Sequence, residues 1–180
     1  MLEAHLFDPL EEPARETLRQ ATAALDQAER RGQPYEMSQA LAAVARGYLS
    51  LRVHATAEAY FELALRWARA AGSTDHTVDL LCSLCETAAQ LARAQDAAAP
   101  GSGHAARERA RDHAFEASTL AGRVADSGWE VTVLLRISDV LDCFGDRDDA
   151  MLLQTRALRL MSGIAPEVVQ VAGLGRLADG

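Results

Sequence analysis

Two cysteines, Cys82 and Cys85, form a C-x2-C pair. Of the motifs in this sequence, it has the residue types best suited to chemistry. This spacing holds a metal ion or supports thiol–disulfide exchange when a second pair or two histidines accompany it. No such partners lie nearby, and Cys85 occupies a position that small residues fill elsewhere in the chain. We therefore expect burial of the pair as small apolar residues. The third cysteine, Cys143, leaves an odd count, which argues against a disulfide framework.

A second candidate for chemistry is a cluster of five aspartates between positions 139 and 149. It lacks the ligand spacing of a helix-flanked calcium loop, so we expect capping or solvated side chains there. The five histidines form no metal-ligand pair, and no nucleophile elbow or phosphate-binding glycine loop occurs. The chain also contains no lysine, which excludes lysine-based chemistry. The sequence thus predicts no catalytic residue, no metal site and no cofactor.

The composition favours helix and limits the classes of partner. Alanine, leucine, arginine and glutamate dominate, and these residues lose little side-chain freedom in a helix. The formal charge is −8, which disfavours nucleic acid because phosphate binding needs a cationic face. The acidic N-terminus does not look like a signal peptide, and no apolar run is long enough for a membrane span. We expect an all-α cytoplasmic protein that binds neither nucleic acid nor membrane.

Apolar spacing and Gly/Pro breaks divide the chain into an irregular lead over 1–12, a helical domain over 13–165 and a C-terminal tail or capping helix over 166–180. The Pro/Gly-rich stretch 96–105 is expected to be a flexible insertion inside the helical domain. The spacing predicts seven helices, over about 13–31, 35–51, 55–71, 75–95, 106–126, 129–144 and 147–161.

A 40-residue period organises the first half of these helices. Ala24-Leu25, Ala28, Gly32 and Leu41 recur as Ala64-Leu65, Ala68, Gly72 and Leu81. Such a period is typical of stacked helical units, each too small to bury its own apolar face.

The same residues resemble the tetratricopeptide repeat. One helix pair has Leu41, Val44-Ala45 and Tyr48 followed by Ala57, Phe61 and Ala64, and another has Leu134, Ile137-Ser138 and Leu141 followed by Ala150, Gln154 and Ala157. The pair between them begins with Leu81, Leu84-Cys85 and Ala88 and then departs from the pattern. If Ala114 is the equivalent of Ala57, this middle pair contains an insertion of 17 residues.

The resemblance implies a right-handed α-α superhelix of about seven helices, made of three tetratricopeptide-like pairs, a preceding helix and a C-terminal cap. In that family the first helix of each pair lines a concave groove. By register, the groove-facing residues are Arg46, Leu49, Ser50, Cys82, Glu86, Gln90, Arg136, Asp139 and Asp142.

The function expected from this surface is a non-catalytic scaffold or adaptor that binds another protein or a peptide in the groove. A homodimer through the terminal helices or Trp67 is a second route to a partner. Two alternatives stay open. One is a regulatory sensor whose superhelix responds to a peptide or small ligand, and the other, less favoured, is an enzyme.

Overall fold

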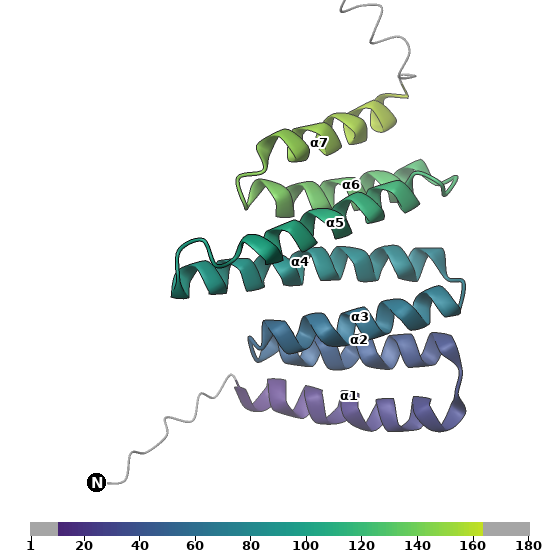
Figure 1. Cartoon of the computed structure of the whole chain (residues 1–180). Coiled ribbons are helices and arrows are strands. Elements are labelled where there is room, and N and C mark those ends of the chain that lie inside the picture. The colour runs from purple at the N-terminus through teal and green to yellow at the C-terminus, as the bar shows by residue number, and fades with distance from the viewer. Residues whose placement is uncertain (1–10, 164–180) are drawn as a thin grey trace, which may run out of the picture.

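The computed structural model describes residues 11–163, which fold into seven α-helices without any strand in that range. Figure 1 shows the helices stacked in chain order, from α1 at one end to α7 at the other. The bounds are α1 Glu11–Arg31, α2 Pro34–Ser50, α3 His54–Ala70, α4 Thr74–Ala98, α5 His104–Ala121, α6 Ser127–Asp142 and α7 Arg147–Ser162.

The predicted all-α class is confirmed, and the packing of adjacent helices is that of a helical repeat arrangement. Each helix packs against its neighbour in the chain, and α4 additionally contacts α6. None of the described helices has an apolar stretch that could cross a membrane.

The ends of the elements differ from the prediction at several places. Glu11 and Glu12 already belong to α1, so part of the predicted lead is helical, whereas 1–10 and the predicted tail or cap over 166–180 lie outside the described residues. Helix α5 ends at Ala121, five residues early. The residues that follow form a turn, and α6 begins directly after Asp126, whose Oδ1 accepts the backbone N–H of Trp129 at 3.0 Å as an N-cap.

Half of the stretch 96–105 is helix, because both flanking helices extend into it. Helix α4 continues to Ala98, α5 begins at His104, and only the turn 99–103 joins them. Asp96 fixes this turn, because its carboxylate accepts the Gly103 N–H at 2.8 Å and pairs with Arg107. A Cβ on Gly103 would lie 2.4 Å from the carbonyl oxygen of Ala92, so the close approach requires glycine. The resulting hairpin projects beyond the α2–α3 and α6–α7 turns (Figure 1).

The buried residues of α5 correct the predicted alignment of the middle helix pair, α4 and α5, with the pair α2 and α3. The buried residues of α5 include Ala110, Ala114 and Ala117, which have the spacing of Ala57, Phe61 and Ala64 in α3. Ala110, not Ala114, is therefore the equivalent of Ala57, and the interval of 53 residues between them exceeds the 40-residue period by 13 rather than 17. The same interval of 53 relates α4 to α6, since Leu81 and Cys85 correspond to Leu134 and Ser138.

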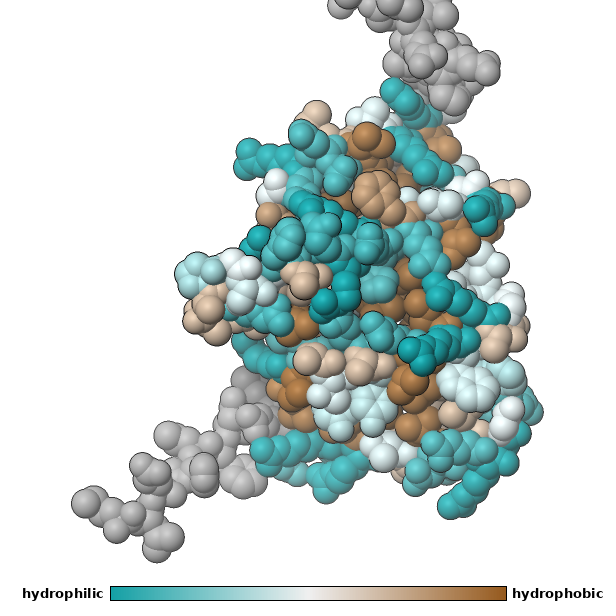
Figure 2. All heavy atoms as spheres, viewed as in Figure 1, coloured by the Kyte–Doolittle hydropathy of each residue, from teal (hydrophilic) through white to brown (hydrophobic). Residues whose placement is uncertain are grey.

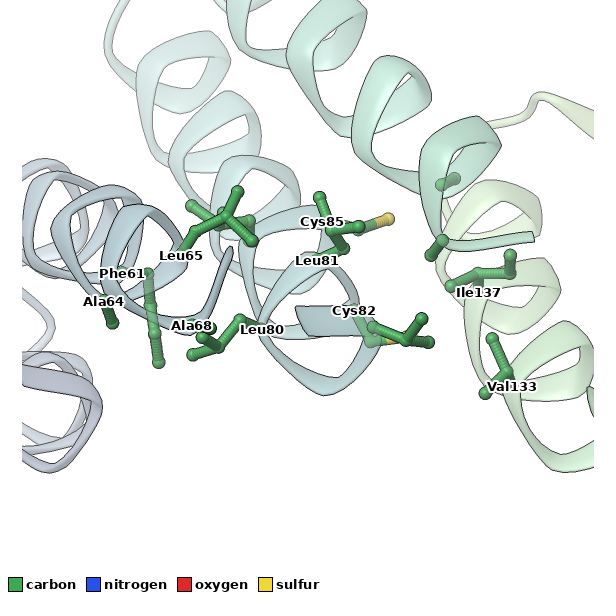
Figure 3. Packing of buried hydrophobic residues seen from close by; sticks show 14 of the residues in the cluster. Phe61, Ala64, Leu65, Ala68, Leu80, Leu81, Cys82, Cys85, Val133 and Ile137 are labelled. Carbon is green, nitrogen blue, oxygen red and sulfur yellow. The ribbon is translucent and has the colours of Figure 1, made fainter. Parts of the chain in front are cut away.

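The core is built from small residues that let the helices approach closely and from leucines that fill the remaining space. In Figure 3, Leu65 and Ala68 of α3 lie on one side of α4, and Val133 and Ile137 of α6 lie on the other. Helix α4 is thus the central element of the stack, because its apolar residues are covered by the helix pairs on both sides, α2–α3 and α6–α7.

Ion pairs between units reinforce this packing. Glu58 of α3 is buried and accepts two hydrogen bonds from Arg109 of α5, from Nε at 2.8 Å and from Nη2 at 3.0 Å. Asp146 lies at the N-cap position of α7, but its side chain makes no cap hydrogen bond and pairs with Arg111 of α5 instead. These contacts tie α5 to the units before and after it.

Candidate binding groove

The first helices of the second and third pairs, α4 and α6, border an open hollow. Its volume is about 360 Å³. Helix α4 contributes one side, and α6 with the residue that follows it contributes the other. The lining residues are Glu86, Ala89, Gln90, Arg93, Arg136, Asp139, Val140 and Cys143.

Arg136 joins the two sides of the hollow. Its Nε donates to Glu86 Oε1 at 2.5 Å, and its Nη2 lies 3.5 Å from Ser83 Oγ. The hydrogen bond to Glu86 raises the pKa of Arg136, outweighing the opposing effect of burial. The guanidinium is thus held in place as a fixed positive charge beside a fixed carboxylate.

The remaining polar side chains of the hollow are accessible. Asp139 and Gln90 are exposed, and the Arg93 guanidinium lies 5.8 Å from the ring centroid of Phe144, within cation–π range. Ala89 is buried and Val140 half-buried, so apolar surface lies between the charges. This arrangement offers hydrogen-bond donors, acceptors and both signs of charge to a ligand, without a nucleophile among them except the Cys143 thiol.

The structure brings four of the nine predicted groove residues together in this hollow: Glu86, Gln90, Arg136 and Asp139. Five do not line it. Arg46 and Ser50 of α2 are exposed, Leu49 packs partly against the core, and Asp142 is exposed beyond the hollow.

Cys82 is the fifth residue that does not line the hollow, and the prediction that it lies on the groove surface is wrong. Its side chain is 1% exposed and lies between α4 and α6, near Val133 and Ile137 (Figure 3). Burial raises the pKa of both Cys82 and Cys85 to about 12, so neither thiol is poised for metal binding or exchange. Residues 11–163 contain no group of three His, Cys, Asp or Glu side chains arranged to hold a metal ion.

Sequence reasoning missed Ala89, Arg93, Val140 and Cys143. Arg93 follows Gln90 by three positions and Cys143 follows Asp139 by four, so continuing each helical stripe by one turn would have found them.

A serine and a histidine also meet away from the groove. Ser38 Oγ lies 2.9 Å from His76 Nε2, and it donates its only proton to the carbonyl oxygen of Ala64 at 2.7 Å. His76 must therefore donate to Ser38 rather than remove its proton, which is the reverse of an activated nucleophile. Burial lowers the pKa of His76, and Ser38 is fully buried. The pair is a structural contact between α2, α3 and α4.

No protein-family model matches the sequence, and no functionally curated protein is significantly similar to it. The geometry of the groove is therefore the basis for any functional conclusion.

Proposed function

We propose that this protein is a non-catalytic interaction scaffold that binds a peptide or protein segment in the hollow between α4 and α6. The observation that supports this proposal is the hollow itself, where Arg93 and Asp139 are accessible beside the fixed Glu86–Arg136 pair. The tetratricopeptide-like identity of the helix pairs is part of the same proposal.

The chemistry of the lining fits a polypeptide of mixed charge. Arg93 can pair with a carboxylate of the ligand, and Asp139 can pair with a basic side chain. Gln90 offers an amide that can hydrogen-bond to ligand backbone, while Val140 gives an apolar contact. Because Arg136 is already held by Glu86, the surface is preorganised, which reduces the ordering cost of binding.

The test uses a displayed library of random peptides, with affinities of the selected peptides measured by titration calorimetry. We expect Arg93→Glu and Asp139→Arg each to weaken binding by at least about tenfold, since each reverses a charge in contact with ligand. The matched controls are Arg66→Glu on α3 and Asp112→Arg on α5, two exposed residues outside the hollow. Equal affinities for groove and control variants would show that the hollow is not the binding surface.

Small-angle scattering of the same complexes separates a scaffold from a sensor. A rigid scaffold keeps its radius of gyration when the peptide binds, whereas a sensor shifts between two curvatures. A change in the profile beyond the added mass of the peptide would favour the sensor.

A cytoplasmic location belongs to this proposal and is supported by three cysteines that form no disulfide. Self-association is a further part, supported by the exposure of Leu63 and Trp67 on α3.

A further inference from the structure

Arg93 is a positive charge in the hollow that has no acidic partner among the described residues. Its guanidinium lies 5.8 Å from the ring centroid of Phe144, and its side chain makes no ion pair or hydrogen bond within residues 11–163. Phe144 is half-buried and packs against the core, so the ring positions the guanidinium while its N–H donors stay available to a ligand. Arg136 differs, because its charge is already paired with Glu86.

Arg93 belongs to the lengthened part of α4. The last residue of α2, Ser50, corresponds to Gln90 at the interval of 40, so residues 91–98 continue past that end. The positions equivalent to Arg93 in the neighbouring units are Val53 and Asp146, which both lie in the turn after the first helix. The extension of α4 therefore adds to the hollow a charged side chain that the first helices of the other two units do not supply.

The rest of the α4–α5 hairpin offers no competing charge. Asp96 pairs with Arg107 and accepts the Gly103 N–H, so its carboxylate holds the turn. Residues 97–103 contain no charged side chain, and Figure 2 shows the projecting end of the hairpin mostly in white and tan. Of the charged residues between 91 and 103, Arg93 is thus the one left for recognition.

Asp139 is the available acid on the opposite wall. It is exposed and has no ion-pair partner in the part of the chain that the structure describes. Helices α4 and α6 run in the same direction (Figure 1), and the Glu86–Arg136 pair aligns them with an offset of 50 positions. With this offset Arg93 lies level with Cys143, which also lines the hollow, and therefore about one helical turn beyond Asp139.

This separation matches two residues of an extended chain. Four helical residues rise about 6 Å along the axis, because an α-helix rises about 1.5 Å per residue. An extended chain rises about 3.3 Å per residue, and its side chains at positions i and i+2 point to the same face. A segment lying along the hollow therefore places one such side chain near Asp139 and the next near Arg93.

We propose that the hollow selects an extended peptide segment in which a basic side chain and a carboxylate lie two residues apart, with the basic group on Asp139 and the carboxylate on Arg93. This inference rests on the proposed peptide-binding function and adds the chemistry and spacing of the ligand. The Glu86–Arg136 pair adds no preference for ligand charge, because each member neutralises the other.

The test uses short synthetic peptides with a dye at the N-terminus and an amide at the C-terminus. Each carries one lysine and one glutamate, placed one, two, three or four positions apart in both orders, in a background of alanine, serine and glutamine. Affinity for the full chain is measured by fluorescence anisotropy. We expect the better order at a spacing of two to bind at least about fivefold more tightly than any peptide of another spacing.

A companion peptide distinguishes the two sources of a carboxylate. It lacks glutamate and ends in a free carboxylate at the same distance from lysine. Tighter binding of the glutamate peptide assigns Arg93 to an acidic side chain, and tighter binding of the companion assigns it to the end of a chain. Both results keep the carboxylate on Arg93, whereas equally tight binding of a peptide with neither group would contradict that contact.

Charge reversals assign each ligand group to its partner. Arg93→Glu should weaken binding of the lysine–glutamate peptide at least about tenfold and should regain affinity for a peptide with two lysines. Asp139→Arg should likewise regain affinity for a peptide with two glutamates. The matched controls Arg66→Glu and Asp112→Arg, outside the hollow, should keep the wild-type preference.

A further variant tests how Arg93 is positioned. Phe144→Leu keeps the charge but removes the ring beneath it, and we expect binding about two- to fivefold weaker. The control is Phe115→Leu, because Phe115 is 51% exposed on α5 and does not line the hollow. Thermal unfolding of each variant reports whether the fold is retained.

Two results would overturn the inference. They are binding without a preference for a spacing of two, including a preference for four that would indicate a helical ligand, and charge reversals that the exchanged peptides do not restore. Both leave peptide binding itself standing. If neither these peptides nor any member of the random library binds, the proposed function is wrong as well.

Discussion

The three cysteines provide a direct test of how α4 is placed, through their reactivity with a chromogenic aromatic disulfide. Cys82 and Cys85 are at most 1% exposed, while Cys143 is exposed at the end of α6. If α4 were instead turned so that Cys82 faced the groove, two thiols, Cys82 and Cys143, would be accessible to the reagent. The number of thiols that react rapidly therefore distinguishes the two arrangements.

The size of the difference follows from burial. With a pKa of about 12, only about one Cys82 or Cys85 side chain in ten thousand is a thiolate at pH 8, and the thiolate is the attacking species. The reagent must also reach sulfur atoms enclosed between α3, α4 and α6, which requires the helices to open. We expect Cys82 and Cys85 to react at least about a thousandfold more slowly than Cys143.

The assay follows released chromophore against time at pH 8, first in buffer and then in denaturant. The folded protein should show one rapidly reacting thiol and the denatured protein three. Cys143→Ser should remove the rapid phase and leave the slow one. Two rapid thiols in the folded wild type, or a rapid phase that survives Cys143→Ser, would refute the burial of the C-x2-C pair.

Two further substitutions and one change of pH test the packing of the helices by urea unfolding. Arg109→Ala should lower the free energy of unfolding by about 1–3 kcal/mol, because it leaves the buried Glu58 carboxylate unpaired, whereas Arg66→Ala should change it by less than about 0.5 kcal/mol. Gly103→Ala should cost about 1–3 kcal/mol through the contact of its Cβ with the Ala92 carbonyl oxygen, and wild-type stability in this variant would contradict that close approach. Stability should also fall as the pH drops below about 6.5, because burial lowers the pKa of three histidines in the folded state and the unfolded chain then binds more protons. The three histidines are His54, His76 and His113. If the pH dependence of stability stayed unchanged after all three were replaced by glutamine, this prediction would be wrong.

Most of the fold could be predicted because helix positions depend on local spacing. The apolar stripe and the Gly and Pro breaks of α2, α3 and α7 locate each of these helices to within one or two residues. The turn after α4 was harder. Pro100 and Gly101 correctly indicated a break, but the sequence alone does not show that the Asp96 carboxylate binds the Gly103 N–H and draws the flanking residues into helix.

The groove was only partly predictable because facing positions depend on the angle between helices as well as on spacing. Glu86 and Arg136 are 50 residues apart, and only the crossing of α4 and α6 makes them partners. Cys82 shows the opposite error. Its register placed it beside the groove, but the contact of α6 with α4 covers that position.

The lengthened middle unit shows why the stack tolerates 13 additional residues. The end of α2 corresponds to residue 90 in the 40-residue period, and α4 continues eight residues beyond it. The turn 99–103 is two residues longer than the turn 51–53. Helix α5 begins six residues before Ala110, whereas α3 begins three residues before Ala57. All of this length lies at the projecting end of the hairpin (Figure 1). The faces that pack against α3 and α6 keep their register, because Leu81 and Cys85 still correspond to Leu134 and Ser138. The intervals of 40, 53 and 40 residues thus describe a single packing scheme with one extended hairpin.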